Sequence, residues 1–254
     1  MRFTSATATA LILSGLVGCS GERKDEQPVQ TTTAGGKLVS ESPEGADRKD
    51  MSLVRMINAL PMTSGVEVSA DDKSLFTNVD YKAVTPYIEL KDNIARFRVK
   101  SGKSDTTIAS NNEMMMDGSR YTVVALPEKD GGVRLRVLHD EIVPDVGKVR
   151  LRVVHGIKGA GEIDVLMLNR TDAIFDNVNF ASEAGYKELD PMDGTLIIRA
   201  DGTNRQLFKK EMKFVAGHSY TIVLAGTSGQ RVDAIIVDDQ ALGTNKMDSS
   251  RVRR

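Results

Sequence analysis

The chain contains one cysteine, no tryptophan and few aromatic residues, and its acidic and basic side chains nearly cancel. A single cysteine cannot close a disulfide within the chain, which excludes the small disulfide-stabilised domains of secreted proteins. A net charge of −1 gives no sign of the basic surface that binds nucleic acid, and 5% aromatic residues offer little for stacking on bases. We therefore expect a protein that binds no nucleic acid.

Long hydrophobic runs are also missing. The most apolar stretch, residues 6–18, is shorter than the roughly 20 residues that a helix needs to cross a bilayer. It follows Arg2 and leads into the tetrapeptide LVGC at 16–19. A positive charge, a short apolar centre and a small residue before the cleavage point are typical of a secretory signal peptide. We predict cleavage between Gly18 and Cys19.

The tetrapeptide resembles the lipobox of bacterial lipoprotein precursors, the substrates of signal peptidase II. The resemblance implies removal of residues 1–18 and lipidation of Cys19 at its thiol and new amino group. Acyl chains would anchor the protein to a lipid bilayer, since each buried CH₂ contributes roughly 0.8 kcal/mol. Ser20 in place of aspartate implies the outer membrane, with the periplasmic face favoured over the cell surface. The alternative is an ordinary buried cysteine.

Both ends of the chain lack the apolar side chains of a folded core. Residues 20–50 mix charges with threonines, glycines and prolines. Such a composition cannot offset the entropy of ordering, so residues 19–51 are predicted to be the lipidated cysteine and a disordered tether. A coil of about 31 residues reaches on the order of 30 Å. Residues 241–254 are predicted to be a polar, basic tail.

From residue 52 onward the sequence pattern occurs twice. The matching segments are VRMINA at 54–59 with LRVVHG at 151–156, and GSRYTVV at 118–124 with GHSYTIV at 217–223. The second set follows the first by 97 to 99 positions, in the same order. This spacing predicts a duplicated domain, with one repeat at 52–143 and the other at 148–240.

Short segments of alternating polarity predict β-strands in both repeats. In KVRLRV at 148–153 every second residue is apolar, which predicts a sheet with one buried face and one solvated face. No helical period is sustained, so we predict an all-β protein with an antiparallel β-sandwich in each repeat, and barrels as the alternative. Tyr121 and Tyr220 resemble the tyrosine corner of such sandwiches. The short link at 140–147 predicts a semi-rigid rod of two domains.

The first strand of each repeat resembles a bacterial family described as domain of unknown function 4397. The motif is RVVH at 152–155 with IDV at 163–165, and more weakly RMINALP at 55–61 with VEV at 66–68. The resemblance implies an immunoglobulin-like or transthyretin-like sandwich, tandem copies on exported or lipid-anchored proteins, and no established activity. Asn58 stands where the motif has histidine, which counts against a shared histidine-based role.

No pattern of residues predicts catalysis. Nucleophile elbows, zinc-binding helices and phosphate-binding glycine loops are missing from the sequence. We predict no catalytic residues, no metal, no cofactor and no enzymatic activity. The one candidate for a zinc site is the junction between the repeats, where His139 and Asp140 precede the strand that carries His155. About 26 Å of strand separates His155 from that junction, which argues against the site.

The sequence thus predicts a lipid-anchored envelope protein with a non-catalytic binding or scaffolding surface. Its partner would be an envelope protein or a polysaccharide. Two alternatives remain: a small metal-dependent or hydrolytic envelope enzyme, and a purely structural spacer. The predicted contact residues lie in two loops at matching positions of the repeats. They are Leu60, Pro61 and Met62 in the first, and Gly156, Ile157 and Lys158 in the second.

Overall fold

A computed structural model describes residues 51–61, 65–101, 104, 106–168, 170 and 172–240. The predicted signal peptide, Cys19, the tether, Met62 and the C-terminal tail lie outside these residues. The described residues form sixteen β-strands and no helix, which confirms the all-β prediction. In this part of the chain there is accordingly no helix long and apolar enough to cross a membrane.

The strands form two units of eight. The first unit contains β1 (Ser52–Asn58), β2 (Val66–Ala70), β3 (Lys73–Val79), β4 (Ile88–Leu90), β5 (Ile94–Ser101), β6 (Thr107–Met114), β7 (Arg120–Pro127) and β8 (Val133–His139). The second unit contains β9 (Val149–Lys158), β10 (Ile163–Met167), β11 (Phe175–Val178), β12 (Ser182–Leu189), β13 (Met192–Ala200), β14 (Gln206–Phe214), β15 (His218–Thr227) and β16 (Val232–Gln240).

Each unit is a sandwich of two four-stranded sheets. The first unit pairs the sheet β4-β1-β7-β8 with β3-β2-β5-β6, and the second pairs β12-β9-β15-β16 with β11-β10-β13-β14. The second unit therefore repeats the strand order of the first. Neighbouring strands are antiparallel except β1 with β7 and β9 with β15, which are parallel. The parallel pairs arise because the chain crosses to the other sheet before it returns.

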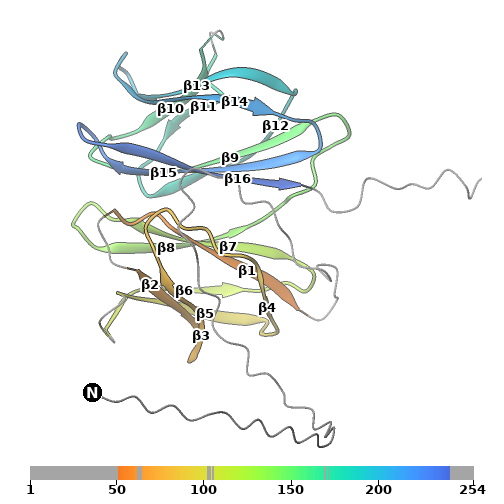
Figure 1. Ribbon diagram of the computed structural model, residues 1–254, viewed down its shortest axis with the longest axis vertical. Helices are drawn as coiled ribbons and strands as arrows, with labels where there is room; N and C mark the ends of the chain where they lie inside the picture. Colours follow the sequence, from red (N-terminus) through yellow and green to blue (C-terminus); the bar gives the residue numbers. More distant parts are fainter. Residues whose placement is uncertain are drawn as a thin grey trace, which may run out of the picture.

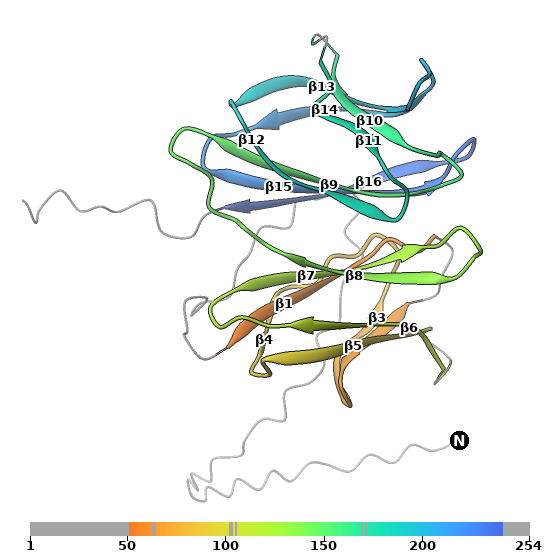
Figure 2. The same ribbon diagram turned by 180° about the vertical axis from the view of Figure 1, so that it is seen from behind.

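The four sheets stack as four layers, with the sheets that contain β1 and β9 facing each other in the middle (Figures 1 and 2). Each unit encloses its own apolar core between its two sheets. Met56, Phe97 and Val123 are fully buried in the first core, and Ile163 and Ile222 in the second. We call the two middle layers the inner sheets.

Both predicted tyrosine corners are confirmed. The Tyr121 hydroxyl accepts a hydrogen bond from the Met116 N–H at 2.9 Å and donates to the Met114 carbonyl at 3.4 Å. The Tyr220 hydroxyl accepts from the Val215 N–H at 3.2 Å and donates to the carbonyl of Lys213 at 3.3 Å. In each unit the phenol thus holds the segment that leads from the outer sheet to the inner sheet.

The prediction that the inner sheets have a solvated face is wrong. All seven residues of β1 are buried, and Arg152, placed on the solvated face by its alternation, is only 2% exposed. That face is covered by the other unit. A third apolar cluster fills this interface with Ile57, Ala59, Val124, Leu126 and Leu138 of the first unit and Val154, Val223, Ala225, Ile235 and Val237 of the second. A packed interface, and not only a short link, therefore joins the units.

We expect Tyr121→Phe to lower the free energy of unfolding by about 1 kcal/mol, because the Met116 N–H loses its acceptor. Tyr220→Phe should cost a similar amount, since its hydroxyl makes equivalent bonds. Urea denaturation followed by circular dichroism measures both, and each variant should unfold in one transition. Unchanged midpoints in both variants would contradict the structural role of the hydroxyls.

Candidate functional site

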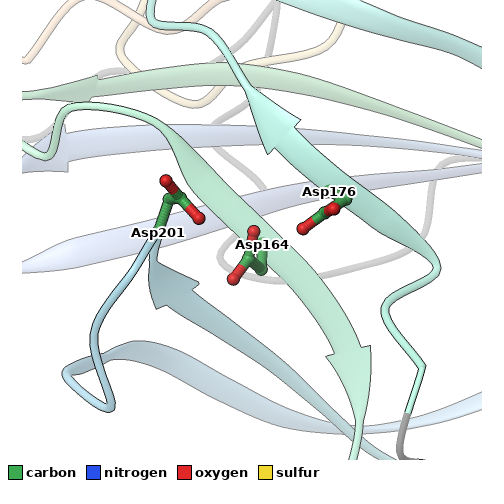
Figure 3. A group of neighbouring side chains, drawn as sticks. All are labelled: Asp164, Asp176 and Asp201. Carbon is green, nitrogen blue, oxygen red and sulfur yellow. The ribbon is translucent and has the colours of Figure 1, made fainter.

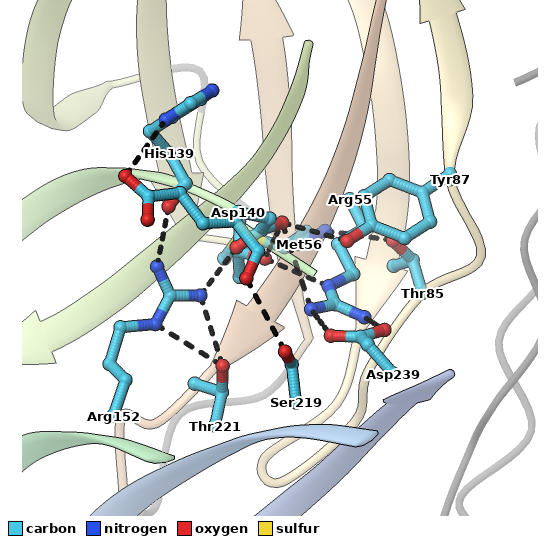
Figure 4. Close-up of polar contacts among 12 residues, drawn as sticks. Arg55, Met56, Thr85, Tyr87, His139, Asp140, Arg152, Ser219, Thr221 and Asp239 are labelled. Atoms are coloured by element: carbon cyan, nitrogen blue, oxygen red, sulfur yellow. Dashed lines mark hydrogen bonds and ion pairs between the residues drawn. The ribbon is translucent and has the colours of Figure 1, made fainter. Parts of the chain in front are cut away.

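Two arginines and two aspartates are buried at the centre of the interface between the units (Figure 4). Arg55 lies on β1, Arg152 on β9 and Asp239 on β16, while Asp140 directly follows β8. None of these four side chains is more than 5% exposed. Their charges cancel, so the interface contains a neutral group of four ions.

Each arginine pairs with a carboxylate of the other unit. Arg55 makes two parallel hydrogen bonds to Asp239, of 2.7 and 2.6 Å. Arg152 donates to Asp140 across the same interface and also to the His139 carbonyl, at 2.9 Å. Bidentate arginine–carboxylate pairs fix orientation as well as distance. The reciprocal exchange therefore sets how the units sit on each other.

Hydroxyl groups complete the bonding of these ions. The Thr122 hydroxyl accepts from Arg55 Nε at 2.8 Å and donates to Asp140 at 2.6 Å. The Thr221 hydroxyl accepts from Arg152 Nε at 3.2 Å. These are the bonds that a buried ion group requires to offset its loss of hydration.

A tyrosine ring also lies against each guanidinium. The Arg55 guanidinium carbon lies 4.5 Å from the centre of the Tyr87 ring, and that of Arg152 lies 4.5 Å from the centre of the Tyr186 ring. The Tyr87 hydroxyl donates to Asp140 at 2.7 Å. Burial raises the pKa of Tyr186 to about 12, so its phenol keeps its proton at neutral pH. The matching residues of the two units thus form the same environment twice.

The ion group is suited to holding the units together and not to acid–base chemistry. Burial alone would raise the pKa of Asp140, but Arg152 and Arg55, together with the hydrogen bonds from Thr122 and Tyr87, lower it below the ordinary value. Asp140 is therefore ionised at neutral pH and surrounded by donors. A general base instead needs a pKa near the working pH and access to a substrate.

His155 has a structural position in the second unit. It is fully buried; its Nδ1 accepts from the Ile157 N–H at 3.1 Å and its Nε2 donates to the Gly161 carbonyl at 2.8 Å. Burial lowers its pKa to about 4. His139 is instead half-exposed, with Glu141 4.0 Å away. Both nitrogens of His155 are engaged by its own loop, so the junction zinc site finds no support in this geometry.

Asn58 holds the corresponding turn in the first unit, as His155 does in the second. Its Oδ1 accepts from the Leu60 N–H at 3.0 Å, two residues along the chain, as His155 Nδ1 does. Its Nδ2 donates to the Val79 carbonyl at 2.8 Å. The two side chains are therefore alternative ways of closing the turn after the first strand of a unit.

The predicted contact loops are partly incorrect. Gly156 and Ile157 are buried within β9 and do not form a loop. A Cβ at position 156 would lie 2.6 Å from the Leu224 carbonyl oxygen and 2.9 Å from the side chain of Leu126, so this glycine allows the units to approach. The turn begins only at Gly159, whose φ is +77°.

In the other predicted loop Leu60 is buried in the core of the first unit and Pro61 is half-buried. Neither Leu60 nor the buried pair Gly156 and Ile157 can contact a ligand at the surface. Lys158, at the end of β9, is the predicted contact residue that lines an open cavity.

The cavity beside Lys158 has a volume of about 340 Å³ and lies where the two units meet. Lys129, from the turn between β7 and β8, contributes from the first unit. The remaining lining residues come from the second unit, and they are Gly159, Gly161, Glu162, Asn179 and Phe180. We call this cavity the seam cleft. Sequence reasoning did not place Lys129 or Phe180 there, because they lie on turns of different units.

The side chains around the seam cleft have free polar ends. Within the part of the chain that the structure describes, the side chains of Lys129, Lys158, Glu162 and Asn179 make no hydrogen bond or ion pair. Phe180 is half-exposed, and its ring meets His155 edge-on with 5.6 Å between ring centres. The cleft thus combines a fixed aromatic ring with uncommitted polar groups, the composition of a small-molecule site.

The matching position on the other side of the interface is closed. Tyr81, which corresponds to Phe180, reaches Asp233 of the second unit with its hydroxyl at 3.5 Å. Lys82 forms an ion pair with the same carboxylate at 3.4 Å. The equivalent strand of the first unit carries Arg134 where β16 has Asp233, and Arg134 pairs within its own unit with Glu128 at 2.6 Å. One seam is therefore tied by an ion pair, while the seam beside Phe180 keeps a cavity although Arg136 Nε donates to the Ala181 carbonyl there at 3.2 Å.

Three carboxylates also gather on the outer sheet of the second unit (Figure 3). Oxygen atoms of Asp164, Asp176 and Asp201 lie within 4.8 Å of one another. The Asn177 N–H donates to Asp164 at 3.2 Å, and its side-chain amide nitrogen donates to Asp201 at 3.0 Å. Arg199 lies directly across from Asp164 on β13. Calcium takes six to eight oxygen ligands, so we assign no cation to this group.

Residues 52–166 match the family model described as domain of unknown function DUF4397. The match covers the first unit and continues into β10 of the second, so the resemblance seen in the sequence is confirmed over this range. No curated protein matches the chain. The DUF4397 description names no activity, so function has to be argued from the residues themselves.

Solved structures with a similar shape are distant from this chain. One is the family CBM26 module CBMbc of Eubacterium rectale Amy13K in complex with maltoheptaose, with 10% identity, 72% of this chain and 95% of that chain covered, and a TM-score of 0.24. Another is a streptococcal virulence factor described by its alpha-glucan binding, with 12% identity, 71% and 95% covered, and a TM-score of 0.25. Likenesses this distant carry no argument about the ligand of this chain.

We expect Asp239→Ala to lower the free energy of unfolding by about 3–5 kcal/mol, because it leaves the buried Arg55 without its bidentate partner. The matched control is Asp190→Ala, which removes an exposed ion pair with Lys148 of similar length, 2.7 Å, and should leave stability unchanged. Chemical denaturation of the full chain measures both. Equal effects would show that the buried pair does not hold the interface.

We also expect His155 to make stability depend on pH. Its pKa is about 4 in the folded chain and about 6.5 when unfolded, so only the unfolded chain takes up the proton between these values. The free energy of unfolding should therefore fall by about 3 kcal/mol as pH drops from 7 to below 4. His155→Asn, which copies Asn58, should remove this slope. Parallel pH curves for the native chain and the variant would exclude this role of the histidine.

Proposed function

We propose that this chain is a lipid-anchored protein of the bacterial cell envelope that binds its partner in the seam cleft without catalysis. The observation that carries the proposal is the difference between the two seams. Asp233, Tyr81 and Lys82 close one of them, whereas the other keeps a cavity of about 340 Å³ beside Phe180. If packing of the two units were the only requirement, we would expect both seams to be closed in the same way.

The buried ion group supports binding at this place. Lys129 belongs to one unit and Phe180 to the other, so their separation depends on the interface. Reciprocal pairing of Arg55 with Asp239 and of Arg152 with Asp140 fixes that separation before a ligand arrives. A site that is already ordered loses less entropy on binding, and therefore binds more tightly.

The anchor follows from the N-terminal sequence. We propose that Cys19 is acylated after cleavage at Gly18 and that it holds the protein at the outer membrane, on the periplasmic face. Residues 20–50 would act as a tether on the order of 30 Å long. The cleft could then meet envelope proteins or polysaccharides at some distance from the lipid surface. We propose no catalytic role for the cleft, since its lining side chains lack a nucleophile paired with a base.

Photo-crosslinking in intact envelopes, followed by affinity capture, tests this function. The native chain should capture a specific partner, and Phe180→Ala combined with Lys129→Gln should reduce the capture at least tenfold. Cys19→Ala should move the protein from the membrane fraction to the soluble fraction. The matched control is Lys209→Gln on β14, an exposed lysine outside the cleft, which should capture as well as the native chain.

Thermal unfolding of the purified variants shows whether the substitutions at Phe180 and Lys129 leave the fold intact. A captured partner that is insensitive to the cleft variant would refute the cleft as the binding surface. Capture of no partner by any form would leave only the spacer, in which the anchor and the stacked sandwiches are the whole function. Membrane retention of the Cys19→Ala chain would refute the lipid anchor independently of the cleft.

A further inference from the structure

We infer that the seam cleft takes a saccharide that carries a carboxylate group. This inference rests on the proposed function, because it names the ligand of the same cleft. It follows from three features of the lining: an aromatic face, an excess of positive charge, and a volume suited to a small ring compound. Each feature selects against a different class of ligand.

The aromatic face belongs to Phe180. Its ring meets the buried His155 edge-on, at an interplanar angle of 81°, so it is supported on one side while part of it stays exposed. The matching Tyr81 uses its hydroxyl to bond Asp233, a contact that phenylalanine cannot make. An aromatic ring without a polar group suits the apolar C–H face of a pyranose ring. Phe180 thus offers an aromatic surface to a ligand, whereas Tyr81 at the matching position bonds the two units together.

The charge of the lining selects an anion. Lys129 and Lys158 provide two ammonium groups from opposite units, against the one carboxylate of Glu162. Neither acidic neighbour of Lys129 lines the cleft, and Glu128 is paired with Arg134 at 2.6 Å. The two lysines therefore keep a net positive charge that a ligand carboxylate can neutralise.

The remaining groups suit hydroxyls. The Asn179 amide can donate and accept, and the Glu162 carboxylate accepts from hydroxyl groups. Glu162 would repel a polyphosphate, which carries several charges close together. A volume of about 340 Å³ lies near the lower limit of small-molecule sites, and so admits one or two sugar rings more readily than a folded protein segment. An acidic sugar meets all of these conditions at once.

Titration calorimetry on the acylated full-length protein in detergent micelles tests the inference. The probes are digalacturonic acid and its fully methyl-esterified form, which share their rings and hydroxyls and differ in the charged carboxylates. We expect the acid to bind at least tenfold more tightly than the ester. Lys158→Gln should remove most of that preference, and Phe180→Ala should weaken binding of both probes. Lys209→Gln serves as the unchanged control.

The outcomes separate this inference from the proposed function. Equal binding of acid and ester, still dependent on Phe180, would overturn the requirement for a carboxylate and leave a binding cleft. No binding of either probe, together with cleft-dependent capture of a protein from envelopes, would overturn the saccharide and leave the proposed function. No binding and no cleft-dependent capture would overturn both. Preference for the acid that persists in Lys158→Gln would place the anion site elsewhere.

Discussion

The exchange of ion pairs between the two units is the constraint on which the rest of this structure depends. Arg55 and Arg152 lie on the central strands of the inner sheets, and each finds its carboxylate in the other unit. Separated from its partner, either unit would expose an apolar face with a guanidinium at its centre. The apolar side chains around the ions supply attraction without direction, whereas the bidentate Arg55–Asp239 pair tolerates only one register. The ions therefore account for the specific arrangement of the units more than for their affinity.

This arrangement also explains why the two seams can differ. An interface fixed at its centre does not need further bonds at both margins. At one margin Asp233 binds Tyr81 and Lys82, and at the other the corresponding ring, Phe180, faces a cavity. Residues that are no longer required for assembly are free to acquire a ligand. The margin is thus where a binding site can develop at little cost in stability.

The histidine in the strand of the DUF4397-like motif has a structural explanation. His155 and Asn58 both accept the N–H two residues along the chain and both donate to a backbone carbonyl. Either side chain therefore closes the turn, which is why the motif can hold asparagine in one unit and histidine in the other. The histidine adds a ring that supports Phe180 beside the cleft. Its chemistry as an acid or base is not used, because burial keeps it neutral over most of the pH range.

Much of the fold can be predicted from the sequence because it depends on neighbours along the chain. Alternating polarity gives the strands, matching segments anticipate two units with the same strand order, and the position of Tyr121 after its turn gives the tyrosine corner. The repeated arginines and tyrosines also held a signal for the ion group, since Arg55 with Arg152 and Tyr87 with Tyr186 occupy matching positions. The acylation of Cys19 and the limits of the predicted repeats remain predictions from sequence.

Tertiary structure alone decided that the second face of each inner sheet is buried against the other unit. An arginine that alternates with apolar residues has the same pattern whether it faces solvent or a buried carboxylate, so the sequence of β9 could not distinguish the two for Arg152. Gly156 was equally ambiguous, because a glycine that opens a turn and one that admits Leu126 look alike in a sequence. The seam cleft joins residues of two units, and no local pattern records such contacts. The sequence by itself determined the strands and their repetition in two units, because both depend on local patterns, and the packing of one unit on the other determined the site.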